Sequence, residues 1–421
     1  MPDAGGTTTA QAADGRDTTI DGRGAWIAAT AAILVLSVSY GSPLLIVVGL
    51  KPITAGLGTI REVTSLAAAF TWVGTGLGGI LMGWLSDRIG VRRVVIFGAI
   101  MIAVGLAFSA IGTVWALYIG HGLLLGLLGN GAMFPPLLVY VSRWFEKRRG
   151  TALALIASGQ YIAGMIWPTV FEHAMARYGW RATMIGYGLV TVALIPPIAV
   201  FLLHPAPAHH AAGMPAVNRL RGKALGLPAN LVLIMLGVAG FCCCVPTALP
   251  QSHLVAFCSD IGISSSTGAA MLSVMTGCAF ISRQFWGWLA DRVGGLITLI
   301  LGSACQALAI SAFLLTQNEA GLFAVSAAFG LGFSGIVPAY VLIVRELFPA
   351  TEASWRVPIV LFISMSGMAF GSWFAGALYD HFGYYAPAFA TGAAFNIANL
   401  TIIGFLLLRQ QWTGGFRPAV A

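Results

Sequence analysis

Charged side chains are scarce in this sequence. Only 9% of its 421 residues are Asp, Glu, Lys or Arg, whereas soluble proteins carry about 25%. Hydrophobic residues make up 58%, and the mean hydropathy is +0.87. A soluble core cannot cover that much apolar surface, so the composition excludes an ordinary soluble protein.

Several kinds of site and signal are also missing. The six cysteines lie in or at the ends of apolar runs without CxxC spacing, so neither a metal site nor a disulfide framework is expected. No nucleophile, base and orienting group occur together, which argues against an enzyme or a cofactor. The first 20 residues lack the basic segment and short apolar core of a signal peptide and are predicted to be a disordered tail.

What the sequence has instead is a series of apolar runs. Each is long enough to cross a hydrocarbon core about 30 Å thick as a helix. We therefore expect an all-α polytopic membrane protein with twelve transmembrane helices. The predicted spans are residues 25–50, 63–85, 94–112, 114–140, 150–173, 180–203, 229–257, 265–289, 296–316, 318–344, 353–379 and 385–408.

The net charge is +8, and the positions of the lysines and arginines along the chain indicate how it crosses the membrane. If both termini lie on the same side, seventeen of the 22 lysines and arginines fall in segments on that side. Four fall in the opposite loops, namely Lys51, Arg61, Arg177 and Arg181. The positive-inside rule then predicts a multi-pass protein with both termini cytoplasmic, which we expect in the cell inner membrane, and the charge gives no sign of a nucleic-acid partner.

The two halves of the chain repeat each other. The octapeptide GWLSDRIG at 83–90 matches GWLADRVG at 287–294 with six identities and a constant offset of 204. Duplicated halves are common in secondary transporters. The polar stretch around 207–229 divides the spans six and six. The predicted units are a cytoplasmic tail 1–24, a six-helix bundle 25–203, a cytoplasmic loop 204–228, a second bundle 229–408 and a cytoplasmic tail 409–421.

The segment GWLSDRIGVRR at 83–93 resembles the signature loop between the second and third helices of the major facilitator superfamily. The resemblance implies a twelve-helix transporter that works by alternating access. Gly83 is expected to let helices approach closely, and Asp87 to face cations at the cytoplasmic end. The candidate residues of this conformational gate are Gly83, Asp87, Arg88, Gly90 and Arg92, with Asp291 and Arg292 from the second copy.

Two further blocks resemble the monocarboxylate transporter family, a group that extends to bacterial oxalate:formate exchangers. The family's first-helix motif is matched by Asp21, Gly22, Gly24, Ala25, Trp26, Ser39, Tyr40 and Pro43, while Arg23 departs from the usual small residue. The stretch PLLVYVSRWFEKRRGTALALIASGQYIAG at 136–164 is similar to the family's loop between the fourth and fifth helices.

Arg283 lies inside the apolar run CAFISRQFWGWLADRVGG at 278–295, where the family carries an arginine on its eighth helix. The family's aspartate one turn earlier is Ala279 here, and the lysine that animal members place after the first-helix proline is Leu44. A guanidinium at a span centre costs about 2.5–3.5 kcal/mol. Every Asp and Glu is predicted to lie in a loop or at the end of a span, with Glu172 the nearest to an exception, so no embedded acidic residue offsets this cost. We therefore predict that Arg283 contacts a substrate carboxylate through two hydrogen bonds.

Other residues are candidates for the same site. Tyr40, Gln160, Tyr161 and Trp167 supply aromatic or hydrogen-bonding groups. His121 or His253 could bind substrate and carry a proton in place of the missing aspartate. On an α-helix His121 and Asn130 would lie on opposite faces, so both cannot face the cavity.

These features predict a secondary active transporter of small organic anions, monocarboxylates above all, with proton symport. A carboxylate exchanger of the oxalate:formate type is the first alternative, because exchange needs no titratable group. A drug or cation exporter is less favoured, since it would need an embedded acidic residue. The expected partners are a small organic carboxylate, a proton and the lipid bilayer, and the chain is expected to function as a monomer.

Overall fold

The computed structural model describes residues 20–145, 149–204 and 223–412, which form long helices and one small strand pair. In the first half these are α1 (Arg23–Ser39), α2 (Gly41–Val48), α3 (Leu50–Leu57), α4 (Arg61–Ile89), α5 (Val91–Ser109), α6 (Val114–Tyr118), the π-helix η1 (Ile119–Gly129), the 3-10 helix η2 (Asn130–Ala132), α7 (Phe134–Ser142), α8 (Arg149–Ala157) and α9 (Gly159–Leu202). In the second half they are β1 (Lys223–Ala224), β2 (Leu227–Pro228), α10 (Ala229–Asp260), α11 (Ser265–Val293), α12 (Gly295–Leu315), α13 (Glu319–Phe333), α14 (Ile336–Leu347), α15 (Ala350–Phe382) and α16 (Ala386–Trp412).

Eleven described segments are long and apolar enough to cross a membrane, and one of them is long enough to cross it twice. That segment, Ala152–Leu202, has 51 residues, whereas one crossing needs about 20. Gly179 breaks it with φ 78° and ψ 162°. The rings of Trp167 and Tyr187 lie 4.7 Å apart, although an unbroken helix would separate them by about 30 Å. The chain therefore turns back at Gly179, and the prediction of an all-α fold with twelve transmembrane helices is confirmed.

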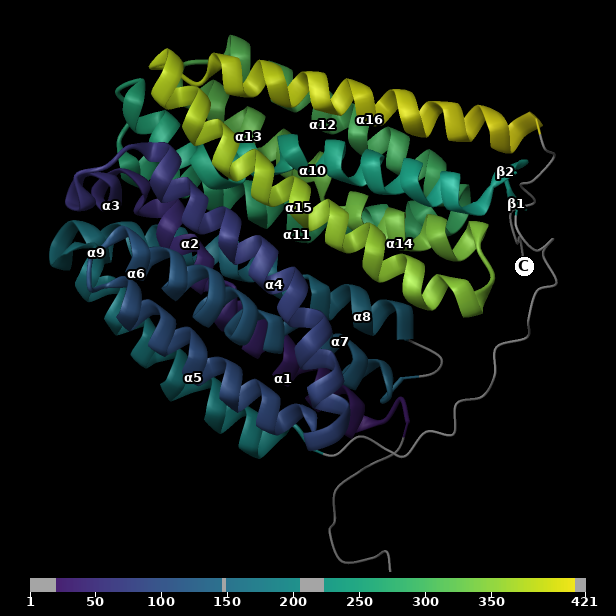
Figure 1. Cartoon of the computed structure of the whole chain (residues 1–421), viewed down its shortest axis with the longest axis horizontal. Helices are drawn as coiled ribbons and strands as arrows, with labels where there is room; N and C mark the ends of the chain where they lie inside the picture. Colours follow the sequence, from purple (N-terminus) through teal and green to yellow (C-terminus); the bar gives the residue numbers. More distant parts are fainter. Residues whose placement is uncertain (1–19, 146–148, 205–222, 413–421) are drawn as a thin grey trace, which may run out of the picture.

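The helices form two bundles, α1–α9 and α10–α16. Figure 1 shows the first bundle, which begins in purple, below the second, which runs from teal through green to yellow. They meet along three lines of contact, α4 with α15, α9 with α11, and α2 with α10. The predicted tails and the loop 204–228 lie largely outside the described residues. Within that loop, Lys223 pairs with Pro228 and Ala224 with Leu227 in an antiparallel register.

Small residues set the spacing within the first bundle. A Cβ atom on Gly78 of α4 would collide with the backbone oxygen of Leu127 in η1, so only glycine permits this approach. The fourth span is not one regular α-helix as expected, because η1 and η2 interrupt it. The expected opposite placement of His121 and Asn130 assumed α-helical spacing and does not apply to this segment.

Charged residues tie the bundles together at one end, which we call the Arg61 end. Asp260 of α10 accepts from Lys51 Nζ at 2.9 Å and from Arg61 Nη1 and Nη2 at 2.5 and 2.8 Å. The carboxylate of Asp380 in α15 also accepts from the backbone amides of Arg61 and Glu62 at the start of α4, at 3.2 and 2.6 Å.

The opposite end, which holds Asp87, lacks such ties among the described residues. Its ion pairs, Arg143 with Asp87 and Arg356 with Glu352, each stay within one bundle. The structure is therefore held shut at the Arg61 end.

Candidate functional site

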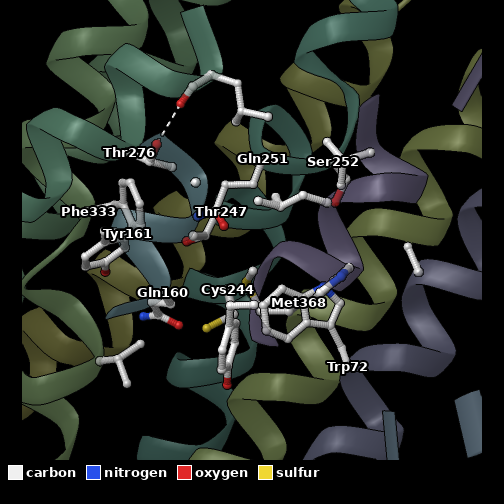
Figure 2. A pocket seen from close by; sticks show the side chains of 18 of the residues that line it. Trp72, Gln160, Tyr161, Cys244, Thr247, Gln251, Ser252, Thr276, Phe333 and Met368 are labelled. Carbon is white, nitrogen blue, oxygen red and sulfur yellow. Dashed lines mark hydrogen bonds between the residues drawn. The ribbon is translucent and has the colours of Figure 1, made fainter. Parts of the chain in front are cut away.

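A cavity of about 120 Å³ lies between the two bundles. Its walls come from α2, α4 and α9 on one side and from α10, α11, α13, α14 and α15 on the other. In the described part of the chain, its lining contains no Asp, Glu, Lys, Arg or His. Figure 2 shows Tyr161 and Phe333 grouped at the left of this cavity and Trp72 at the right. The site is thus small, partly aromatic and uncharged at its surface.

Polar lining groups concentrate on α10 around two prolines. Thr247, Gln251 and Ser252 line the cavity next to Pro246 and Pro250. A proline inside a helix removes a backbone donor and leaves a carbonyl without its usual partner. Such polar groups are tolerated in a membrane helix only where they face protein or a cavity.

The hydroxyl of Thr247 is held in a fixed orientation. It donates to the carbonyl of Cys243 at 2.9 Å and accepts from Gln306 Nε2 at 2.5 Å. Gln306 in turn accepts from Asn396 Nδ2 at 2.8 Å. A buried hydrogen-bond network inside the second bundle therefore supports this wall of the cavity.

Arg283 lies directly behind the wall made by Tyr161. Its Nη1 donates to the Tyr161 hydroxyl at 3.2 Å, and its Cζ is 5.4 Å from the centre of that ring. The side chain is only 7% exposed, and its Nε has no hydrogen-bond partner among the described residues. Among the described residues no acidic group pairs with it, and Ala279 one turn earlier is fully buried. Arg283 is thus a buried cation with unused donor capacity, one side chain away from the cavity.

The other predicted site residues divide into two groups. Tyr40, Gln160 and Tyr161 line the cavity. Trp167 does not, because its indole donates to the carbonyl of Ser37 at 2.8 Å and its ring packs on Phe171.

Both candidate histidines lie outside the cavity lining. His121 is buried within the first bundle, with Nδ1 2.8 Å from the hydroxyl of Ser109. His253 is buried near the Arg61 end, with Nδ1 3.0 Å from the Tyr385 hydroxyl and Nε2 2.8 Å from the carbonyl of Ser372. Neither ring lines the cavity in this conformation.

Some lining residues could not be predicted from the sequence. Trp72, Thr276, Phe333 and the pair Met365 and Met368 gave no signal beyond apolar or small character. The exception is CVPTALPQSH at 244–253, where polar residues between prolines in an apolar helix do mark a lining segment.

The predicted gate residues lie together at the Asp87 end. Arg143 donates to Asp87 at 2.6 Å, and Arg92 Nε donates to the carbonyl of Leu203 at 3.1 Å. Gly90 turns the chain with φ 88°. The expected close approach at Gly83 is wrong for the described part of the chain, in which no atom lies within 4 Å of a Cβ built there.

The second copy of the gate repeats only part of this pattern. Arg292 stacks on Trp288 at 4.2 Å, as Arg88 does on Trp84 at 4.0 Å. Asp291, unlike Asp87, makes no ion pair with any described residue.

The fold and cavity define a membrane protein of two six-helix bundles around a central site. Residues 25–254 and 236–419 match the family model of the Major Facilitator Superfamily. The chain belongs to this superfamily and is a secondary transporter, not an enzyme.

The chain also resembles individual proteins, at low sequence identity. The chain is 25% identical over 349 residues to monocarboxylate transporter 13 of Rattus norvegicus, covering 82% of this chain and 79% of that protein. It is 23% identical over 328 residues to the agnestins efflux protein AgnL12 of Paecilomyces divaricatus, covering 77% and 74%. A solved bacterial homolog of the human lysosomal transporter Spinster, in an inward-facing and occupied conformation, superposes with a TM-score of 0.71 at 14% identity, covering 93% of this chain and 98% of that one. At that identity the match establishes the fold alone.

Proposed function

We propose that this transporter carries small monocarboxylates, and that Arg283 supplies the positive charge that binds them. The observation that carries the proposal is the placement of Arg283. It is buried, has no acidic partner among the described residues and touches the cavity wall through Tyr161. A buried cation needs a counter-charge, and a substrate anion would supply it. Rotation of the Tyr161 side chain would let the guanidinium reach the cavity.

The size of the cavity favours a small substrate. Its volume of about 120 Å³ is below the roughly 300–1,000 Å³ of sites for drug-sized ligands. The aromatic and apolar lining would hold a short carbon chain, while the carboxylate would point toward Arg283. A larger efflux substrate would require the walls to move apart.

The membrane orientation is part of the proposal. The charge distribution favours a cytoplasmic Asp87 end. Since the Arg61 end is the closed one, the structure would then face inward. The proposed membrane is the cell inner membrane, and both termini would be cytoplasmic.

The transport of the anion could be coupled in two ways, to a proton in symport or to a second anion in exchange. Proton symport requires a titratable group whose protonation depends on the conformation. Exchange requires none, and the absence of Asp, Glu and His from the described cavity lining favours it. Uptake that follows an imposed pH gradient without internal substrate supports symport, whereas uptake that requires internal carboxylate supports exchange.

Ligand-induced stabilisation tests the proposed substrate class. Purified protein is heated with monocarboxylates and with the matching neutral primary amides, since only ligands that prefer the folded site raise the melting temperature. We expect carboxylates to stabilise wild type and amides not to. Arg283→Gln should lose the effect, and Arg177→Gln, at an exposed position of the Arg61 end, should retain it. Equal stabilisation by acids and amides, or full stabilisation of Arg283→Gln, would contradict the proposal.

A further inference from the structure

The Arg61 cluster, by which we mean Lys51, Arg61, Asp260 and Tyr385, joins the bundles through an unequal set of charges. Two cations of the first bundle share the single carboxylate of Asp260 in the second. Arg61 is only 8% exposed, and its Cζ lies 3.7 Å from the ring centre of Tyr379. Arg61 is the central member of the cluster, because it contacts both Asp260 and Tyr385.

A chain of hydrogen bonds connects Arg61 to His253. Arg61 Nη1 donates to the hydroxyl of Tyr385 at 2.9 Å, and His253 Nδ1 lies 3.0 Å from the same oxygen. On the other side of the ring, Nε2 lies 2.8 Å from the carbonyl oxygen of Ser372. His253 itself is 1% exposed. One hydroxyl thus separates the imidazole from a guanidinium.

The partners determine where the hydrogens lie. A carbonyl only accepts, so Nε2 of His253 carries a hydrogen and donates it to Ser372. In the neutral ring Nδ1 then accepts from the Tyr385 hydroxyl, whose oxygen accepts from Arg61. Every donor in this series of hydrogen bonds has an acceptor, provided that His253 is neutral.

A second proton on His253 would disfavour this arrangement. A hydrogen on Nδ1 would face the hydroxyl hydrogen of Tyr385 and would add a positive charge one hydroxyl away from Arg61. The charged and titratable groups of the elements at this end are Arg61 and Glu62 of α4, Lys51 of α3, Tyr379 and Asp380 of α15, Tyr385 before α16, and Asp260 on α10 itself, and of these Tyr385 contacts the ring. Within the described chain, no acidic side chain from these or the other elements packed on α10 contacts either ring nitrogen.

We propose that His253 is a proton-binding site that controls the Arg61 cluster. Proton binding at Nδ1 turns the Tyr385 hydroxyl away from its present role, weakens its bond to Arg61 and favours opening of the Arg61 end. Release of the proton restores the closed arrangement. This inference rests on the symport form of the proposed function, and deepens it by placing the coupling proton outside the substrate cavity, where the composition of the cavity lining does not argue against it. It also follows the rule that a ligand shifts an equilibrium only through unequal affinity for the two states.

Distance measurements between spin labels test this without any substrate. Labels are placed at Ala55→Cys and Ala320→Cys, two exposed positions at the Arg61 end in different bundles. Cys278 and Cys305, the cysteines that are not buried, are replaced by Ser. We compare the wild-type background with His253→Gln, whose amide can still donate to Ser372 and accept from Tyr385. The control is His173→Gln, since the side chain of His173 is 70% exposed.

In the wild-type background and in the His173→Gln control, a longer-distance population should grow as the pH falls from about 8 to about 4, a range that extends below the usual titration of histidine because the closed structure disfavours the second proton. His253→Gln should show one distribution at both pH values, and Arg61→Gln should show the longer distances at both. A wild-type distribution that does not change with pH, or a pH response retained by His253→Gln, would overturn the proposal. Because these distances require no ligand, a failed carboxylate screen would leave this result standing, and the reverse also holds.

Discussion

Gly78 and Gly83 lie on the same helix, α4, and have opposite surroundings. A Cβ atom on Gly78 would meet the backbone of Leu127, whereas one on Gly83 would meet nothing within 4 Å. Gly83 belongs to the repeated motif and was expected to pack closely, and Gly78 drew no attention in the sequence. Glycine content alone therefore does not identify the positions where helices approach.

We predict that Gly78→Ala destabilises the protein, because an added methyl group in a tight interface costs about 1–3 kcal/mol. Gly83→Ala is the matched control and should unfold at the wild-type temperature. Thermal unfolding in detergent measures both. A lower melting temperature for Gly83→Ala than for Gly78→Ala would show that the packing is assigned to the wrong glycine.

At the same scale, the sequence could identify some site residues and not others. Arg283 and Tyr161 were both named from the sequence, because an embedded charge and the family-like block at 136–164 are visible there. Their mutual contact was not predictable, since it joins helices from different bundles. His121 was named as a candidate but does not line the cavity, and the π-helical backbone of η1 in which it lies was not predictable from the sequence.

Among the elements, α9 depends most on one backbone position. The helix turns back at Gly179, where φ 78° and ψ 162° lie in a region open mainly to glycine. The sequence predicted two spans here, because the polar residues between 173 and 180 interrupt the apolar run. It did not indicate how tight the turn is.

Gly179→Ala should therefore lower stability by about 1–3 kcal/mol, the cost of forcing a side chain into this backbone conformation. Gly186→Ala, in the second arm of α9, also has open space around its Cβ and has no such strain. It should behave like wild type in chemical denaturation. Equal stability of the two variants would mean that the turn relaxes without cost.

For the molecule as a whole, the duplicated octapeptide and the twelve apolar runs were sufficient to predict the fold. They could not predict which end is closed. That property depends on Lys51, Arg61 and Asp260, which are far apart in the chain and resemble ordinary loop charges. Charge pairing between distant segments becomes visible only when the bundles are placed in space.

Loss of the Asp260 carboxylate should favour opening of the Arg61 end, because two neighbouring cations would lose their shared partner. Cys244 lines the cavity and is 3% exposed, so it can report this change. We predict that Asp260→Asn speeds its labelling by a membrane-impermeant maleimide added outside intact cells, with Cys278 and Cys305 replaced by Ser. Asp291→Asn, at the opposite end, should label at the wild-type rate. Unchanged labelling in Asp260→Asn would show that these ion pairs do not hold the end closed.

The central claim is that Arg283 binds the carboxylate that the protein transports. Its most direct test is uptake of labelled L-lactate, as a representative monocarboxylate, into proteoliposomes with matched amounts of protein. Loss of a charge-assisted contact of about 1.5–3 kcal/mol corresponds to a reduction of roughly 10- to 100-fold. We predict a loss of that size for Arg283→Gln, a partial loss for Arg283→Lys, which keeps the charge without the paired donors, and none for Arg177→Gln. Uptake by Arg283→Gln at the wild-type rate would contradict the claim.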